Sequence, residues 1–511
     1  MPSVREHPLL LPEILQPISC FVSLSDAISC ARVCRTWNDP FTSAIWHTID
    51  FEEQDRFVDV DPAVVKKHGH RIRSVLAVTQ DDEIQALHHL SVCKVTNLTI
   101  VMPGTVNFQA YCGDLLRQNA ASLKELDIIA EGDSPVFPFD AIFLPTGGRT
   151  TSPLSVLRIQ NLTMTRDGFS SLLKMCPALE EMSLALITLL STSCSEPYQH
   201  TGVKHLKAPL EQLFGFARTS AVEGPSILAH FPQLTKFHSW CPDDPPPFPY
   251  DDMEIQFAKH CPLITEVITE THAAVTPMFL GTIKNLVHIT VEEITSSVIM
   301  AMLFHGATLE TVRTFAPDLN YYFENMVPEL EEKKACSIAL GWEFQLIPQT
   351  CARLTKLELP TFVMDMDDIE RKPWVCMGLS QLFVRIRGLE TAKTIDHATV
   401  LWAKHMKEKW QDRSGPVTTP SEVPEVFRIS ENFQVSQVSK ASEDLEISED
   451  FEDDDDGNWI DIEDDEEEDE TVCGENSIPA RFARHFSKFE KIQCLWIGNG
   501  LNLFMPLAGN I

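Results

Sequence analysis

The chain has 511 residues, of which 44% are hydrophobic, 8% aromatic and 23% charged, close to the usage of ordinary globular proteins. This composition excludes a collagen, a mucin and a wholly disordered chain. With 74 acidic and 41 basic residues the formal net charge is −33, so the chain on average repels phosphate backbones and anionic headgroups. We therefore expect no nucleic-acid partner and no membrane partner.

The 14 cysteines lie at irregular spacings, several of them within apolar runs. Such spacing is typical of buried reduced thiols and not of a disulfide framework, and it indicates a cytoplasmic and/or nuclear protein. The apolar stretch near the N-terminus is interrupted by Pro12, Glu13 and Pro17, unlike a secretory signal. The densest apolar run, 184–190, is far shorter than the roughly 20 residues that cross a bilayer.

Apolar residues recur every three or four positions between residues 9 and 50, which predicts several short amphipathic helices. Pro12 suits the first turn of one helix, and Pro17 predicts that this helix is short or restarts there. Ser25 and Asp26 are a plausible cap for a second helix that runs to about Trp37. So small a unit leaves apolar side chains facing outward unless a partner covers them.

This segment resembles an F-box. The resemblance rests on Leu11-Pro12-Glu13-Ile14-Leu15, on Ile18, Phe21, Leu24 and Asp26, on Val33-Cys34-Arg35-Thr36-Trp37 and on Ile45-Trp46. It implies a three-helix element that binds a Skp1-type adaptor and, through it, a cullin and a RING protein. The residues expected to contact Skp1 are Leu11, Pro12, Ile14, Leu15, Ile18, Phe21, Val33 and Trp37, some of which must form the element's own core. The alternative is a helical cap on the following domain.

From about residue 70 an apolar-x-x-apolar-x-apolar hexad recurs. The clear copies begin at Val95, Leu123, Leu154, Leu179, Leu354, Leu379 and Ile492, and weaker copies begin at Ile72, Val203, Leu234, Ile264, Leu286 and Leu309. The intervals predict a unit of one strand plus one helix. Several hexads follow a helical stretch that ends in Cys-Pro or Phe-Pro, where proline stops the helix and the chain turns into the strand.

The hexads resemble divergent leucine-rich repeats, which implies an α/β fold: a horseshoe-shaped solenoid whose concave sheet face binds an unknown target protein. An ordinary α/β domain is the alternative. Target contacts are expected on the variable hexad positions, such as Lys124, Glu125, Asp127, Arg158 and Gln160.

Near the C-terminus, apolar spacing predicts an amphipathic helix over 391–410, and Phe482, Phe486 and Phe489 predict another before the last hexad. Between them, residues 443–470 hold 19 acidic residues and no Lys or Arg, which predicts disorder. The expected domains are an F-box-like helical domain at 1–50, the repeat solenoid at 51–411, the acidic disordered insertion at 412–480, and the last repeat with its cap at 481–511.

No familiar signature of a catalytic nucleophile, nucleotide loop or metal site occurs, so no cofactor and no metal are expected. The resemblances imply the substrate-recognition subunit of a Skp1–cullin–F-box (SCF) ubiquitin ligase, which contributes binding to ubiquitin-dependent degradation and no catalytic residue. One alternative is a leucine-rich-repeat interaction scaffold without a ligase role. The other is an unrecognised α/β enzyme.

Overall fold

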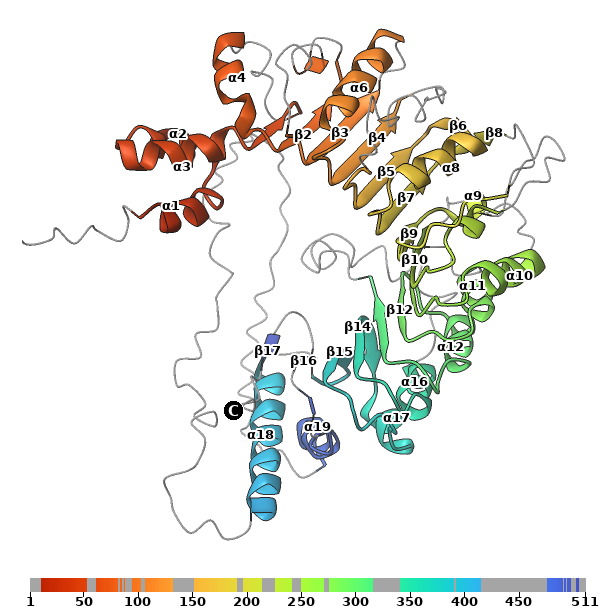
Figure 1. Ribbon diagram of the computed structural model, residues 1–511. Helices are drawn as coiled ribbons and strands as arrows, with labels where there is room; N and C mark the ends of the chain where they lie inside the picture. The colour runs from red at the N-terminus through yellow and green to blue at the C-terminus, as the bar shows by residue number, and fades with distance from the viewer. Residues whose placement is uncertain are drawn as a thin grey trace, which may run out of the picture. The chain divides into compact units, whose positions relative to one another are not determined.

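The computed structural model describes residues 11–52, 61–80, 83–84, 87, 94–102, 106–131, 151–190, 196–213, 226–240, 250–270, 275–315, 341–389, 392–414, 476–489, 491–492, 494–497 and 502–504. The chain divides into two compact units, one with the described residues up to Phe315 and one with those from Gly341 onward. Each unit is described separately, and the elements are labelled in Figure 1.

The first unit begins with three helices, α1 (Pro12–Ser19), α2 (Leu24–Ala31) and α3 (Arg35–Ile45). A parallel sheet follows in the order β1-β2-β3-β4-β5-β7-β9-β10-β11-β12-β13. Its strands are β1 (Thr48–Asp50), β2 (Ser74–Val78), β3 (Asn97–Met102), β4 (Glu125–Ala130), β5 (Val156–Gln160), β7 (Glu181–Ala185), β9 (His205–Lys207), β10 (Lys236–Trp240), β11 (Glu266–Glu270), β12 (His288–Val291) and β13 (Thr311–Thr314). Each hexad predicted in this unit from Ile72 onward has its strand here.

The hexads are aligned across this sheet. From β3 to β13, the second apolar residue of each hexad pairs with its counterpart on the next strand. The row consists of Leu98, Leu126, Leu157, Met182, Leu206, Phe237, Val267, Ile289 and Val312, all almost completely buried. Burying a side chain of this size contributes about 1.5–3 kcal/mol, so the row fixes the register of the nine strands that it crosses.

Helices cover one face of this sheet (Figure 1). They are α4 (Pro62–His68), η2 (Gly69–Arg71), α6 (Val106–Asn119), α8 (Arg166–Met175), α9 (Leu210–Leu213), η3 (Ile227–His230), α10 (Tyr250–His260), α11 (Thr276–Thr282) and α12 (Ser296–Leu303). A small second sheet joins β6 (Thr163–Thr165) to β8 (Thr188–Leu190) in parallel. The other face of the large sheet carries the alternate, half-buried residues of each strand.

A recurrent turn connects helix to strand. The N–H of Leu179 donates to the carbonyl of Cys176 at 3.1 Å, and the N–H of Leu354 donates to that of Cys351 at the same distance. Leu234 repeats the contact with Phe231 at 3.2 Å. Burial raises the pKa of the Cys176 thiol to about 12, so this thiol stays neutral and packs as a small apolar group. The predicted junction between helix and strand is confirmed at these positions.

Asn161 and Leu186 occupy equivalent positions, each directly after a strand of the sheet. Both have left-handed backbones, with φ of 57° and 52°. Asn161 Nδ2 donates to the carbonyl of Ala130 at 3.0 Å, which links neighbouring strands. Leu186 has no such polar group, and its side chain is exposed. The left-handed conformation is easier for asparagine than for leucine because the short polar side chain can bond locally.

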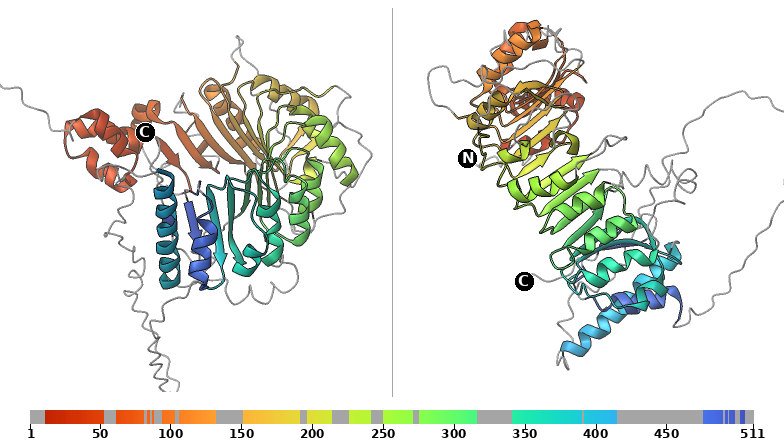
Figure 2. Two further views of the ribbon diagram at one scale, coloured as in Figure 1. Left: turned by 90° about the horizontal axis from the view of Figure 1, so that it is seen from below. Right: turned by 90° about the vertical axis from the view of Figure 1, so that its right-hand side faces the viewer.

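The strands of the second unit are β14 (Lys356–Met364), β15 (Gln381–Ile386) and β16 (Cys494–Ile497), which pair in parallel, and β17 (Asn502–Phe504), which is antiparallel to β16. Figure 2 gives two further views of these strands and their helices. The helices are α15 (Gly341–Phe344), α16 (Leu346–Thr350), α17 (Met366–Arg371), α18 (Ala392–Ser414) and α19 (Ile478–Phe486).

The two helices predicted near the C-terminus are α18 and α19. Phe482 and Phe486 of α19 are completely buried, and Trp374 meets the ring of Phe486 edge-on with centroids 5.4 Å apart. Leu382 pairs with Leu495, so the strand that follows the acidic segment belongs to the same sheet as the strand that precedes it. The predicted acidic insertion, apart from its ends at 412–414 and 476–480, lies outside the described residues.

Candidate functional site

The first helix, α1, begins at Pro12 and contains eight residues. Proline fits the first turn because the amide hydrogen it lacks has no helical partner there. The helix passes through Pro17, which removes one backbone hydrogen bond, and ends two residues later at Ser19. Of the two predictions for Pro17, the short helix is confirmed and the restart is wrong.

The second and third helices are separated by a break that the sequence did not predict. Ser23, and not Ser25, caps α2: the N–H of Asp26 donates to Ser23 Oγ at 3.2 Å, and the Ser23 hydroxyl donates to Asp26 Oδ2 at 2.7 Å. This reciprocal pair fixes where the helix begins. The helix ends at Ala31, and Cys34 is extended before α3 begins. The prediction of one helix reaching Trp37 is therefore wrong.

A small core joins the three helices. Leu15 of α1, Ala27 of α2 and Phe41 of α3 are buried against one another. Trp37 packs partly against this core, and its indole stacks on Phe41 with ring centroids 5.4 Å apart. Each helix therefore contributes one completely buried side chain, and the other apolar residues that pack against this core are only partly buried.

The residues predicted to contact a partner divide between core and surface. Leu15 is 0% exposed, so it is one of the residues that form the element's own core. Trp37 and Leu11 are half-buried. The exposed members are Ile14, Ile18 at 38%, Phe21 at 89% and Val33 at 64%. Pro12 is the first residue of α1, and its side chain lies outside the described part.

The element is joined directly to the sheet. The N–H groups of Arg73 and Ser74 donate to the carbonyl of His47 at 2.9 and 3.0 Å, and β1 pairs with β2 from Thr48 onward. Arg71 donates to the Asp39 carboxylate at 2.5 Å and to its carbonyl at 3.1 Å. These contacts connect α3 to η2 and to the first strands without a separate linker.

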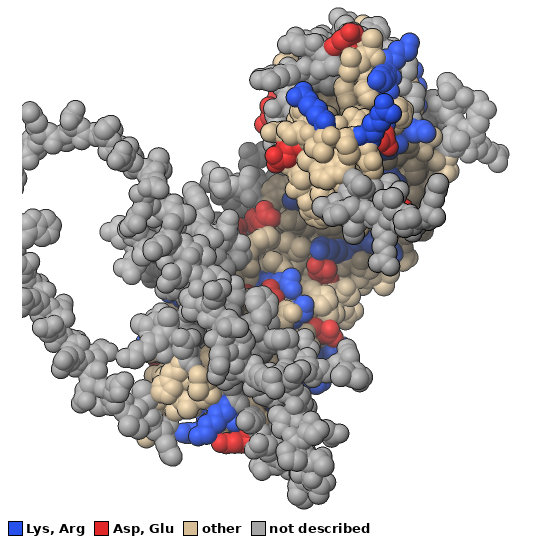
Figure 3. All heavy atoms as spheres, turned by 90° about the vertical axis from the view of Figure 1, so that its left-hand side faces the viewer, with Lys and Arg blue, Asp and Glu red and all other residues tan. Residues whose placement is uncertain are grey.

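The sheet face that no described helix covers carries the residues predicted to contact a target. Glu125 and Asp127 on β4 and Arg158 on β5 are half-buried on this face, alternating with the buried hexad residues. Gln160 is exposed at the end of β5, and Lys124 is exposed just before β4. Burial raises the pKa of the Asp127 carboxyl, while Arg158 opposes that rise. Figure 3 shows one side of the molecule, on which basic side chains (blue) lie next to acidic side chains (red).

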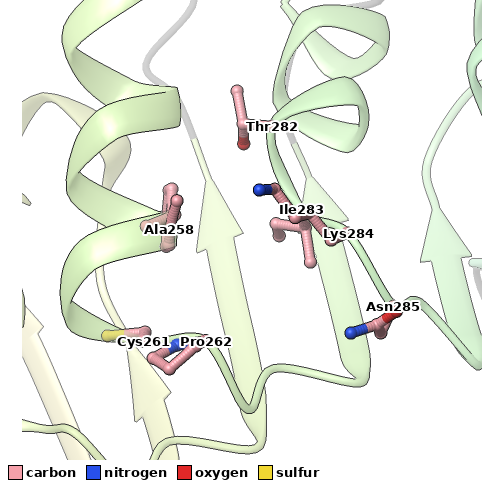
Figure 4. A pocket seen from close by; sticks show the side chains of 8 residues that line it. Ala258, Cys261, Pro262, Thr282, Ile283, Lys284 and Asn285 are labelled. Atoms are coloured by element: carbon pink, nitrogen blue, oxygen red, sulfur yellow. The ribbon is translucent and has the colours of Figure 1, made fainter.

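A cavity of about 190 Å³ lies between α10, α11 and the turns that follow them (Figure 4). Its lining includes Phe257, Cys261 and Lys284. The Cys261 thiol donates to the carbonyl of Phe231 at 3.5 Å, and burial raises its pKa to about 12. A thiol held neutral in this way is a poor nucleophile. The cavity is a gap between neighbouring helices with no catalytic arrangement among the side chains that line it.

Within the described ranges, no three His, Cys, Asp or Glu side chains gather as they would around a metal ion. A search of the same residues finds no helix with the length and apolar character needed to cross a membrane.

Comparison with known protein families matches residues 12–52 to the F-box-like domain. The N-terminal element is an F-box-like domain. Domains of this family typically bind the adaptor Skp1. A comparison with curated proteins finds no match.

The F-box-like domain exposes two further apolar residues that the sequence prediction did not include among the contacts. Leu24 and Ile28 lie four residues apart on α2 and are both exposed. Four residues are about one helical turn, so both side chains lie on the same face. The spacing alone could have identified Ile28, had the start of α2 been placed correctly at Leu24.

Proposed function

We propose that this chain is the substrate-recognition subunit of an SCF ubiquitin ligase. The match of residues 12–52 to the F-box-like domain is the observation that carries the proposal. In this role the domain binds Skp1, and Skp1 links the chain to a cullin and a RING protein.

The exposed apolar residues of the F-box-like domain support docking to Skp1. Ile14 and Ile18 lie one turn apart on α1, Phe21 follows the helix, and Leu24 and Ile28 extend the apolar surface along α2. A fully buried phenylalanine contributes about 1.5–3 kcal/mol, and a few central aromatic and aliphatic anchors usually dominate an interface. Phe21, at 89% exposed, has the most surface to bury.

The target-binding part of the proposal is a leucine-rich-repeat solenoid. The aligned hexads from β3 to β13, each with one strand per 22 to 31 residues, support it because repeat proteins stack one such unit on the next. The sheet face without helices is then the surface that holds the target protein.

The proposed mechanism is proximity. The F-box-like domain fixes the chain to the ligase, the sheet face holds the target, and a separate conjugating enzyme transfers ubiquitin to it. The chain itself supplies binding surfaces and no catalytic group, and it works in the cytoplasm, the nucleus or both.

The test is target turnover in cells depleted of this protein and supplied with either the native chain or an Ile18→Ala/Phe21→Ala variant. Proteins that co-purify with both chains should be degraded faster only with the native chain. Phe304→Ala is the matched control, because Phe304 is 83% exposed but follows α12, outside the F-box-like domain. If every bound protein is degraded at the same rate with the native chain and with the variant, the ligase role is contradicted and an interaction scaffold is favoured.

A further inference from the structure

On the face of the first unit's sheet that no described helix covers, the residues form rows across the strands. In the central row, successive positions on β4, β5, β7, β9, β10 and β11 pair in register. These residues are Asp127, Arg158, Ser183, Lys207, His238 and Ile268. The row holds two positive charges, on Arg158 and Lys207, and one carboxyl group, that of Asp127, which pairs in register with Arg158.

In the neighbouring row, two basic side chains already contact carboxylates of the same row. Lys236 contacts Glu266 at 2.8 Å, and His205 contacts Glu181 at 3.5 Å. In the central row, Arg158 reaches Glu181 only at 3.8 Å. Lys207 has no ion pair with any described carboxylate, although it is half-buried.

Aromatic rings lie at Lys207 and at His238, its neighbour across the strands. Its Nζ lies over the indole of Trp240, 5.4 Å from the ring centroid. His238 contacts Trp240 edge-on and stacks on Phe315, with centroids 6.3 Å apart in both cases. Phe315 follows β13, so it reaches back across two strands to cover His238.

The carboxylate of Glu270, at the end of β11, is already engaged with His238. Glu270 Oε1 lies 2.7 Å from His238 Nε2, so the imidazole donates to it. Burial lowers the pKa of His238 despite this contact, so the ring is neutral at physiological pH. The cation at Lys207 is thus left as the main uncompensated charge of the cluster, beside two aromatic rings that offer apolar surface.

We propose that Lys207, Trp240 and Phe315 form the anchor of a site for an acidic segment of the target protein, in which a carboxylate lies beside a large apolar side chain. The carboxylate pairs with Lys207 and the apolar side chain packs on the two rings. A second carboxylate of the segment reaches Arg158, which lies two strands away, or about 10 Å. The inference rests on the proposed function, because it names the target chemistry that the sheet face selects.

The acidity of the whole chain does not prevent this recognition. At physiological ionic strength, exposed charges more than about 8 Å apart are largely screened. The charges closest to the bound segment therefore decide whether the electrostatic interaction is attractive or repulsive. A partly desolvated lysine beside aromatic rings also gains more from a carboxylate than a fully solvated one does.

The test uses the full chain and two fluorescein-labelled peptides. The first has glutamate at every third position with phenylalanine residues between the glutamates. The second is identical except that glutamine replaces each glutamate. Fluorescence anisotropy should show about tenfold tighter binding of the glutamate peptide, and Lys207→Gln should remove that preference. Trp240→Ala should weaken the binding of both peptides, and Trp240→Phe should restore part of that binding.

Lys236→Gln is the matched control, since Lys236 lies one row away and is already paired with Glu266. It should change affinity less than twofold. Equal affinity for the two peptides, no binding of either, or equal losses for Lys207→Gln and Lys236→Gln would overturn the proposal. Skp1 binding tests only the F-box-like domain. If Skp1 does not bind, the proposed ligase role is contradicted, but the result with the peptides still stands.

Discussion

The indole of Trp46 stacks on the imidazole of His68, with ring centroids 5.1 Å apart and planes inclined by 13°. Trp46 follows α3 and His68 ends α4, so this stack holds the F-box-like domain against the first helix over the sheet. Trp46→Ala should lower the free energy of unfolding by about 1–3 kcal/mol and loosen the junction. Denaturant unfolding of the full chain, with hydrogen exchange at α3, measures both effects.

Trp46→Phe is the control for this stack, because a smaller ring keeps part of the contact. Its loss of stability should be less than half that of Trp46→Ala. Equal protection of the α3 amides in the native chain and in Trp46→Ala would show that the hydrogen bonds of His47 and Asp39 hold the junction alone.

Leu15 and Ile18 should respond very differently to truncation. Leu15→Ala removes a completely buried side chain from a core that has only one such residue per helix, and it should cost about 2–4 kcal/mol. Ile18→Ala should stay within about 0.5 kcal/mol because its side chain is exposed. Hydrogen exchange of α1 to α3 distinguishes the two, and similar loss of protection in both variants would place Ile18 in the core.

Stability should fall as the pH falls from about 6.5 toward 4. Burial lowers the pKa of His230 and of His485 from 6.5 to about 4 in the folded chain. Below pH 6.5 the unfolded chain therefore binds protons that the folded chain does not, which favours unfolding. The effect is absent above that pH, grows through the interval, and reaches on the order of 3 kcal/mol per group below pH 4. Denaturant titrations across this interval measure it.

His485→Phe isolates the contribution of one histidine. The ring of His485 lies among Trp374, Phe486 and Phe489, and its Nε2 is buried without a hydrogen-bond partner. Phenylalanine fits this aromatic surrounding and cannot be protonated, so the variant should lose less stability on acidification. A pH dependence as steep as that of the native chain would assign the effect to other groups.

Leu186→Asn should stabilise the chain by about 0.5–1 kcal/mol. Leu186 holds a left-handed backbone at the position where Asn161 bonds to the preceding strand. Asparagine tolerates this conformation better and adds a hydrogen bond to its neighbour. The measurement is the denaturation midpoint at neutral pH. Leu186→Ala, which keeps a Cβ and gains no polar group, is the control and should not stabilise.

The strands were predictable from the sequence, whereas the helix boundaries of the F-box-like domain were not. Each hexad places buried residues at alternating positions, and one buried face of a sheet demands such a pattern. The start of α2 depends on a single pair, Ser23 and Asp26, and Ser25 offers a similar side chain two residues later. Leu15 and Ile18 have the same apolar character, so only packing could separate core from surface.

The charged face of the sheet was predictable in outline only. The alternation assigns Glu125, Asp127 and Arg158 to one face, but the cluster of Lys207, Trp240 and Phe315 brings together residues more than a hundred positions apart in the sequence. Aligned hexads place Lys207 beside His238, but the stacking of Phe315 on His238 depends on the path of the chain after β13. The hexads do not predict that path.

Direct binding of Skp1 tests the central claim most sharply. Isothermal titration of purified Skp1 into the full chain should give a complex with one copy of each protein, weakened at least tenfold by Ile18→Ala/Phe21→Ala and unchanged by Phe304→Ala. Circular dichroism should show that all three chains are folded. No heat of binding with the folded native chain, or equal affinity in all three, would contradict docking through the F-box-like domain.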